Sequence, residues 1–221
     1  EIPNTAGNHS SPFTTENSEY VVAGTRFSVP VPQKDMPISE YKGNFKGNLT
    51  FVSVDKEDGD MDIAFQILVP GFDYDLAHAG KGKSHGWMFF SSYNTEEANT
   101  KLEATASQND KDFIAAVNWK LAEKLVAEGK GYEMPGQYLN NEMDHHTHAA
   151  TSKSYDKVMV LNPNECPGLI YYLPTPKSPH GVDVDPTGEY IVGNGKLSSD
   201  MSVHSFDKML AAIEAEDFEK L

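Results

Sequence analysis

The feature that most constrains the fold is an internal repeat that follows two of the eight histidines. His9 is followed ten residues later by EYVVAGTRFS (19–28), and His180 is followed nine residues later by EYIVGNGKLS (189–198). Both segments fit the pattern E-Y-[VI]-V-x-x-x-[RK]-[FL]-S and continue into a second strand-like run that ends in Asp. Each copy therefore predicts a histidine, a turn, a strand and a further strand.

Repeated pairs of antiparallel strands are typical of β-propellers, in which small sheets are arranged around a central axis. The region from His85 to Trp119 contains two more consecutive strand-like runs, and we expect it to be a third, less similar unit. We therefore expect an all-β fold, a partial β-propeller of about three blades with short helical insertions. Because a closed propeller needs about four to eight blades, we expect residues 1–221 to be one fragment of such a domain.

The rest of the chain agrees with this expectation, because runs of β-branched and aromatic residues alternate with Gly, Pro, Asn and Asp. The strand-like runs are 19–31, 48–55, 61–69, 86–94, 112–119, 157–162, 168–174, 189–197 and 202–207. Helical periodicity is confined to 116–131 and to the last segment, 207–221. We expect the polar segments 33–47, 73–85 and 133–156 to be irregular excursions on the surface.

The repeat also suggests a role for the two histidines. In a propeller the first strand of each blade runs beside the axis, so residues just before equivalent strands point toward one shared place. We expect His9 and His180 to converge there. Imidazoles contributed one per blade suit copper, zinc or iron rather than calcium or magnesium. The alternative is a non-catalytic propeller scaffold in which both histidines are turn residues.

Composition excludes several classes of partner. The 33 acidic residues outnumber the 18 basic ones and give a net charge of −15, which disfavours nucleic acid and anionic membranes. No apolar run approaches the roughly 18 residues of a membrane span. The single cysteine, Cys166, excludes an internal disulfide, and no nucleophilic serine elbow or phosphate-binding glycine loop is present.

A second group of histidines also resembles a metal site. His145, His146 and His148 lie within four residues of one another in the segment DHHTHAAT. Because neighbours in an extended segment alternate sides, His146 and His148 can share a face, whereas His145 cannot easily join them. The polar flanks favour an exposed loop with adventitious metal affinity. A metal-binding protein that uses this loop is the alternative function.

Acidic residues form two further candidates for ion binding. Tyr93, Glu96, Asp110 and Asp112 lie in two polar segments, 93–98 and 108–113, and oxygen ligands of this kind suit calcium. An acidic surface loop with no bound ion is the competing interpretation. The acidic run 55–62 is expected to be a hairpin tip, where charge mainly serves solubility.

Several motifs together resemble one enzyme family. The stretch PTPKSPHGVDVDPTGEYIVGNGKLSSDMSV resembles the propeller domain of nitrous oxide reductase, a bacterial copper enzyme of denitrification that reduces N2O to N2 and water. IPNTAGNH resembles the segment with an earlier copper-binding histidine, MDIAFQILVPG a following strand, and SSYNTEEA with NDKDF the calcium loop. These motifs occur in the family order along nearly all of the chain. The resemblance implies a periplasmic oxidoreductase with a seven-bladed propeller.

The resemblance implies that His9 and His180 bind the family's tetranuclear copper–sulfide centre. The family uses seven histidines there, and it has a C-terminal cupredoxin domain with a dinuclear copper centre. This chain has only two matched histidines and no cupredoxin segment, so we expect the isolated fragment to be inactive. Chain order places His145 and His146 in an insertion after the calcium loop, so the role of the family's adjacent histidine pair is not transferred to them.

For calcium, the resemblance implies that Tyr93 binds through its carbonyl and that Glu96 and Asp112 bind through their carboxylates, with a further carbonyl near Ala106. Ser178 is the remaining calcium candidate, because it stands where relatives have an amide side chain two residues before the ligand histidine. Its side chain is shorter than an amide. The implied partners of the full-length enzyme are N2O, a small electron donor such as a c-type cytochrome or cupredoxin, and a second copy in a homodimer.

Overall fold

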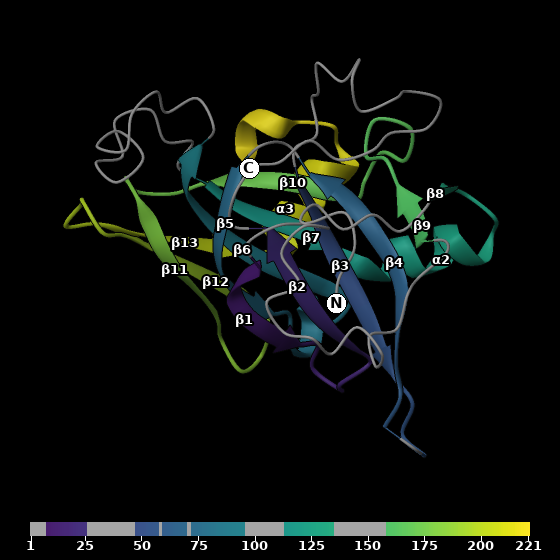
Figure 1. Cartoon of the computed structure of the whole chain (residues 1–221). Helices are drawn as coiled ribbons and strands as arrows, with labels where there is room; N and C mark the ends of the chain where they lie inside the picture. The colour runs from purple at the N-terminus through teal and green to yellow at the C-terminus, as the bar shows by residue number, and fades with distance from the viewer. Residues whose placement is uncertain (1–7, 26–46, 58, 70–71, 96–112, 135–157) are drawn as a thin grey trace.

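The computed structural model describes residues 8–25, 47–57, 59–69, 72–95, 113–134 and 158–221 (Figure 1). Within these residues the chain is mostly β-strand, and the strands form three separate sheets, none of which closes into a barrel. The expectation of a mainly β fold is therefore confirmed. The arrangement of the sheets as propeller blades stays a prediction.

The first sheet has the strand order β1-β2-β3-β4-β9-β8. Its strands are β1 (Asn8–Thr14), β2 (Tyr20–Thr25), β3 (Gly47–Val54), β4 (Met61–Val69), β8 (Tyr132–Met134) and β9 (Val158–Leu161). The second sheet has the order β10-β7-β6-β5, with β5 (Phe72–Ala79), β6 (Trp87–Thr95), β7 (Phe113–Asn118) and β10 (Ile170–Pro174). The third sheet consists of β11 (Pro179–Val184), β12 (Tyr190–Gly195) and β13 (Met201–Ser205). Neighbouring strands are antiparallel, apart from the parallel pair β4 and β9.

The helices are shorter than their sequence patterns predict. Residues 116–118 complete β7, and α2 (Trp119–Ala127) begins only after Asn118, whose side chain accepts the N–H of Leu121 at 2.9 Å. At the C-terminus α3 (Phe206–Glu214) ends early, and a short 3-10 helix, η3 (Phe218–Lys220), follows it. No helix in the described ranges is long and apolar enough to cross a membrane.

The expectation that 73–85 is irregular is wrong. This segment contains most of β5 and the 3-10 helix η2 (Gly82–Ser84), and β5 pairs with β6. Its apolar residues Tyr74 and Ala77 are buried, although aspartates interrupt the run and give it a loop-like composition. The third unit of the repeat therefore starts with β5 rather than with His85. The other two polar segments, 33–47 and 133–156, lie mostly outside the described residues. Residue 47 belongs to β3, and residues 133–134 belong to β8.

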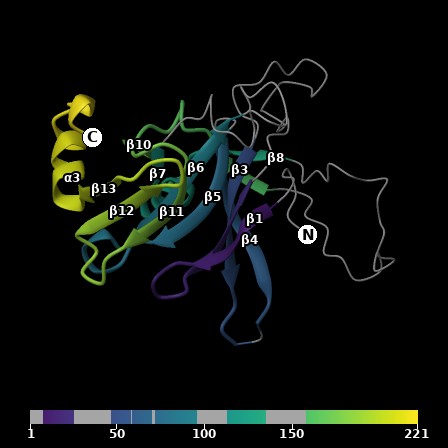
Figure 2. The same cartoon turned by 90° about the vertical axis from the view of Figure 1, so that its left-hand side faces the viewer.

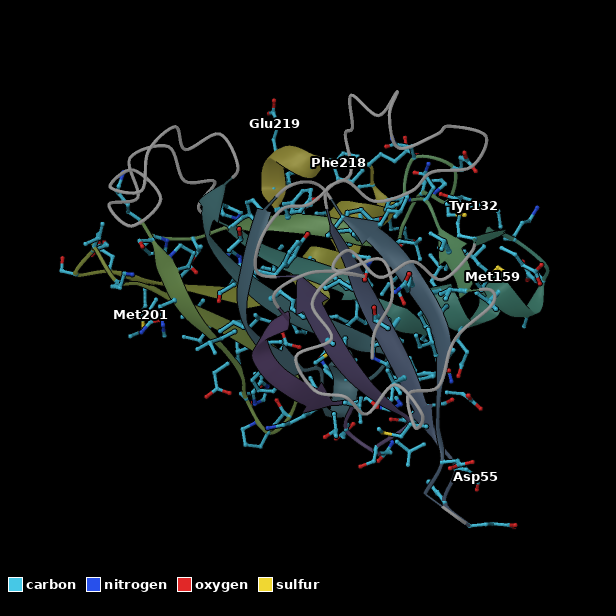
Figure 3. The ribbon with its side chains drawn as sticks, viewed as in Figure 1. Asp55, Tyr132, Met159, Met201, Phe218 and Glu219 are labelled. Carbon is cyan, nitrogen blue, oxygen red and sulfur yellow. The ribbon has the colours of Figure 1, made fainter. Side chains whose placement is uncertain are left out.

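The acidic run 55–62 is largely the hairpin turn between β3 and β4, as the sequence predicts. Asp55 lies at the far end of this hairpin (Figure 3). Its N–H donates to the carbonyl of Asp60 at 2.8 Å, and the described residues of the turn are exposed. These charges face water.

The turn of the first repeat copy closes on Thr15. The N–H of Thr15 donates to the carbonyl of Tyr20 at 3.0 Å, and the N–H of Tyr20 donates back to the Thr15 hydroxyl at 3.0 Å. The N–H of Ser18 donates to the Thr15 carbonyl at 2.9 Å, and Ser18 has a φ of 58°. One hydroxyl residue and one left-handed residue therefore define the turn.

The turn of the second copy has the same construction, with Asp185 in place of Thr15. The N–H of Asp185 donates to the Tyr190 carbonyl at 3.0 Å, and the Tyr190 N–H donates to the Asp185 carboxylate at 2.8 Å. Gly188, with a φ of 75°, takes the left-handed position. Hydrogen bonds from Thr187 and from the Tyr190 N–H lower the pKa of Asp185 to about 2. The repeat read from sequence is thus also a repeat of turn structure.

The strands before the two turns, β1 and β11, also correspond, but the expected position of the two histidines is wrong. His9 and His180 lie within strands β1 and β11, not in loops before the first strand. The pairing of β1 with β2 is irregular between His9 and Phe13, and the pairing of β11 with β12 is irregular between Pro179 and Gly181. Each histidine therefore belongs to an irregular stretch of the first strand in its copy.

The second sheet lies between the first and the third (Figure 2). Successive residues of β6 point to opposite faces of the sheet. Phe90 belongs to a buried cluster that includes Phe51 of the first sheet, whereas Phe89 belongs to a cluster that includes Ile191 of the third. The three sheets are therefore stacked face to face around two apolar cores.

Candidate metal centre

His180 is an exposed residue of β11 and lines an open depression of about 340 Å³. The other lining residues are Gly181 of the same strand, Asn194 of β12 and Lys196 just beyond it. The register break between Pro179 and Gly181 places His180 in a bulge, a device that redirects side chains and is common beside functional sites. The structure thus presents an imidazole at the surface of the third sheet.

The backbone that leads to His180 is constrained by β12. Ser178 is fully buried and has a φ of 58°, a left-handed conformation that costs a residue with a side chain roughly 1–2 kcal/mol. Its carbonyl accepts the N–H of Lys196 at 2.7 Å. A strained and buried residue therefore fixes the chain two residues before the histidine.

His9 lies close to the corresponding place in the first sheet. Its backbone pairs with Gly24 of β2. The repeat aligns Gly24 with Asn194 of β12, which pairs with Gly181, the residue after His180. Strands β1 and β11 both contact β5, so the two histidine positions lie on strands that flank the same strand (Figure 2). The side chain of His9 is outside the described part of the structure, and convergence of the two imidazoles stays a prediction.

The imidazole of His180 is a chemically suitable copper ligand, but one imidazole is too few to hold a copper ion. Exposed imidazole is an appropriate copper ligand. Among the described residues there is no group of three or more His, Cys, Asp or Glu that could hold a metal ion. A copper ion at His180 would therefore need imidazoles from elsewhere, and His9 is the candidate within this chain.

The calcium candidates are placed only in part. Tyr93 lies near the end of β6, while Glu96, Ala106 and Asp112 lie outside the described residues. Ser92 of β6 pairs with Phe113 of β7, so the segment that carries these candidates connects two neighbouring strands. The calcium assignment, including Ser178, stays a prediction, as does metal binding by the loop of His145, His146 and His148, which also lies outside the described residues.

Other histidines in the described ranges have structural partners. His85 Nδ1 lies 3.1 Å from a Glu16 carboxylate oxygen, and His85 Nε2 lies 3.1 Å from one of Glu19. The ring meets Trp119 edge to face, with centroids 5.4 Å apart. His204 Nε2 lies 2.8 Å from the carbonyl oxygen of Pro174. His85 therefore joins the first repeat turn to the loop between β5 and β6, and it is not the counterpart of His9.

His78 joins the second sheet to the third. Its Nε2 lies 3.1 Å from an Asp183 carboxylate oxygen and 3.4 Å from Lys81 Nζ, and its Nδ1 lies 3.1 Å from the Ala79 carbonyl oxygen. Burial and the Lys81 charge lower the pKa of His78, and Asp183 only partly opposes them. The neutral imidazole is therefore the form that the folded protein favours.

This arrangement predicts a loss of stability in mild acid. The unfolded chain binds a proton at His78 below about pH 6.5, whereas the folded chain resists it, so the contribution of neutral His78 is complete above pH 6.5 and is lost as pH falls through the lower folded pKa. We expect the urea midpoint to fall less between pH 7.5 and pH 5.5 in His78→Gln than in the parent chain. Because burial also lowers the pKa of His204, His204→Gln is measured alongside. An unchanged pH dependence in His78→Gln would contradict the assignment.

Sequence reasoning missed two residues beside His180. Lys196 occupies the [RK] position of the repeat, so the repeat pattern could have indicated it as a candidate site residue. The Ser91 hydroxyl of β6 lies 3.1 Å from the His180 carbonyl oxygen and can donate a hydrogen bond to it. No sequence pattern marks that contact, because the two residues are far apart in the chain.

The chain is distantly related to proteins named nitrous-oxide reductase. It is 26% identical over 199 residues to the one from Pseudomonas fluorescens and 22% identical over 193 residues to the one from Stutzerimonas stutzeri. Each alignment covers 87% of this chain but only 26% of the relative, so the chain spans about a quarter of the length of these curated relatives. No family model matches the chain.

A solved structure from Bacteroides uniformis ATCC 8492, described as a candidate 6-phosphogluconolactonase, also aligns with the chain. The alignment covers 93% of this chain and 56% of that one, at 13% identity and a TM-score of 0.32. A TM-score of this size does not establish a shared fold.

Proposed function

We propose that this chain is part of a copper-dependent oxidoreductase that reduces nitrous oxide to dinitrogen and water. Each N2O takes up two electrons and two protons and is released as N2 and H2O. The observation that carries the proposal is the alignment of 87% of the chain with relatives named nitrous-oxide reductase. Because the chain spans about a quarter of those relatives, the activity is proposed for a larger polypeptide and not for these 221 residues alone.

In this proposal His9 and His180 are two imidazole ligands of a tetranuclear copper–sulfide centre, and other parts of the protein contribute the remaining ligands. When bound, the copper ions would supply electron density that weakens the N–O bond of N2O. The exposure of His180 beside an open depression supports the assignment. The place of both histidines on strands that contact β5 supports it as well.

The three sheets would be consecutive blades of a propeller whose inner strands are β1, β5 and β11. Each sheet contains an antiparallel series of consecutive strands, and β5 contacts both of the other inner strands. Tyr20 and Phe51 of the first sheet are buried in the core that it shares with the second sheet. Their counterparts in the third sheet, Tyr190 and Val203, are 49% and 57% exposed. Met201 of the same sheet, labelled in Figure 3, is 65% exposed. A further blade would cover this face.

Calcium would order the loops beside the copper centre, with Tyr93, Glu96, Asp112 and Ser178 as candidate ligands. The location of Tyr93 at the end of a strand next to a polar segment supports this part. We further propose a periplasmic location, a dinuclear copper centre in a separate cupredoxin domain, a c-type cytochrome or cupredoxin as electron donor, and a homodimer of the full-length protein.

A chimaera tests this function. The matched region of the Pseudomonas fluorescens relative is replaced by this chain, and N2O consumption is measured by gas chromatography with a reduced artificial electron donor. We expect copper uptake and turnover, with turnover lost in His180→Ala and retained in His204→Ala. The isolated chain should show no turnover, because two histidines cannot assemble four copper ions. A folded chimaera that lacks copper at the cluster, or turnover by the isolated chain, would contradict the proposal.

A further inference from the structure

Ser91 connects two irregular strands at the candidate site. It lies in the middle of β6 and is fully buried. Its hydroxyl accepts the N–H of Leu76 at 3.1 Å and can donate to the carbonyl of His180 at 3.1 Å or to the carbonyl of Leu76 at 3.3 Å. One side chain of the second sheet thus contacts the backbones of β5 and β11.

Both contacts fall where regular strand pairing is interrupted. The pairing of β5 with β6 shifts between Tyr74 and Ala77, which brackets Leu76. The pairing of β11 with β12 shifts between Pro179 and Gly181, which brackets His180. Backbone groups at such shifts need partners outside the ladder, and the Ser91 hydroxyl is a buried partner for both.

The carbonyl contact bears on the direction of the imidazole. In a bulge the orientation of the peptide group determines where the side chain of the same residue points. Ser178 constrains the backbone before His180 through its left-handed conformation and its bond to Lys196. Ser91 constrains the peptide that follows His180, from the neighbouring sheet.

We propose that Ser91 is a positioning residue for His180: its hydroxyl fixes the peptide of the β11 bulge and thereby aims the imidazole at the metal. The claim that the imidazole binds a metal rests on the proposed function. The claim that Ser91 orients His180 concerns the protein alone. Residues that orient a metal ligand typically change affinity by about 10- to 100-fold when they are removed.

The test compares Ser91→Ala and Ser91→Thr, which keeps a hydroxyl, with Ser92→Ala. Ser92 is the next residue of β6 and is also fully buried, so it controls for loss of a buried hydroxyl. The ¹³C carbonyl and imidazole ¹⁵N shifts of His180 are measured by NMR, Cu(I) affinity by competition with a chromogenic chelator, and folding by urea unfolding. We expect Ser91→Ala to move the His180 signals and to weaken Cu(I) binding by about tenfold, at the low end of that range. Ser91→Thr should restore both, and Ser92→Ala should change neither.

Unmoved His180 signals in folded Ser91→Ala would overturn the inference, whatever happens to copper. Moved signals with unchanged Cu(I) affinity would also overturn it, provided that His180→Ala itself weakens binding. If His180→Ala leaves the Cu(I) affinity unchanged, the copper assignment in the proposed function fails. The NMR signals of His180 then decide alone whether Ser91 positions the histidine.

Discussion

Replacement of His180 by alanine should weaken Cu(I) binding by the chain at least tenfold. The imidazole is exposed beside the depression that Lys196 and Asn194 also line, so a copper ion reaches it without rearrangement of the core. Loss of a group that merely orients a ligand costs about 10- to 100-fold in affinity, and loss of the ligand itself should cost no less. Competition with a chromogenic Cu(I) chelator measures the change.

The pair His9→Ala and His180→Ala shows whether the two imidazoles share one ion. Ligands of one ion are energetically coupled, so the double variant should lose much less than the sum of the two single losses. His204→Ala is the matched control, because its ring is occupied with the Pro174 carbonyl. Additive losses would mean separate sites. If the double variant His146→Ala/His148→Ala loses Cu(I) binding and His180→Ala does not, the result would favour metal binding by the loop of His145, His146 and His148 instead.

The second large effect is expected at Gly188, where the turn of the third sheet meets the second sheet. Gly188 has a φ of 75°, and a Cβ at this position would lie 1.6 Å from the Lys81 carbonyl oxygen. The same junction includes the N–H of Lys83, which donates to the Thr187 carbonyl at 3.1 Å. Gly188→Ala should therefore displace the loop between β5 and β6 and lower the free energy of unfolding by about 3 kcal/mol or more.

Gly59 provides the control for this prediction. It has a similar φ of 80°, but a Cβ there would meet nothing within 4 Å. Gly59→Ala should cost only the left-handed conformation, about 1–2 kcal/mol. The difference between the two variants in urea unfolding isolates the clash at the junction. Equal losses would show that the turn does not pack against Lys81 as described.

The parts of the fold that the sequence predicts are those fixed by local chemistry. The repeat turns depend on Thr15 or Asp185 at the first position and on a left-handed residue three positions later, and all of these lie within six residues. The hairpin of β3 and β4 is similarly local. Strands with β-branched and aromatic residues between turn residues were therefore predictable, with ends correct to within a few residues.

The parts that could not be predicted depend on contacts distant in the chain. Strand β5 has a loop-like composition, and it is a strand because β6 pairs with it and because Tyr74 and Ala77 are buried. Strands β8 and β9 extend the first sheet although they follow β7 of the second. No periodicity in the sequence encodes that choice of partner.

The candidate site divides in the same way. His9 and His180 were recognisable because each precedes a copy of the same strand pattern. Their place within strands, the left-handed Ser178 and the contact from Ser91 depend on the packing of one sheet against another. The motif thus identifies the candidate ligands, whereas the backbone around them depends on tertiary structure.

The claim that His9 and His180 serve one copper centre is tested most directly by a crystal structure of the copper-loaded chimaera. We predict that both imidazoles coordinate the same centre, each with a copper–nitrogen distance of about 2 Å. Ring nitrogens more than about 12 Å apart would be too distant for one cluster with bonds of that length and would contradict the claim.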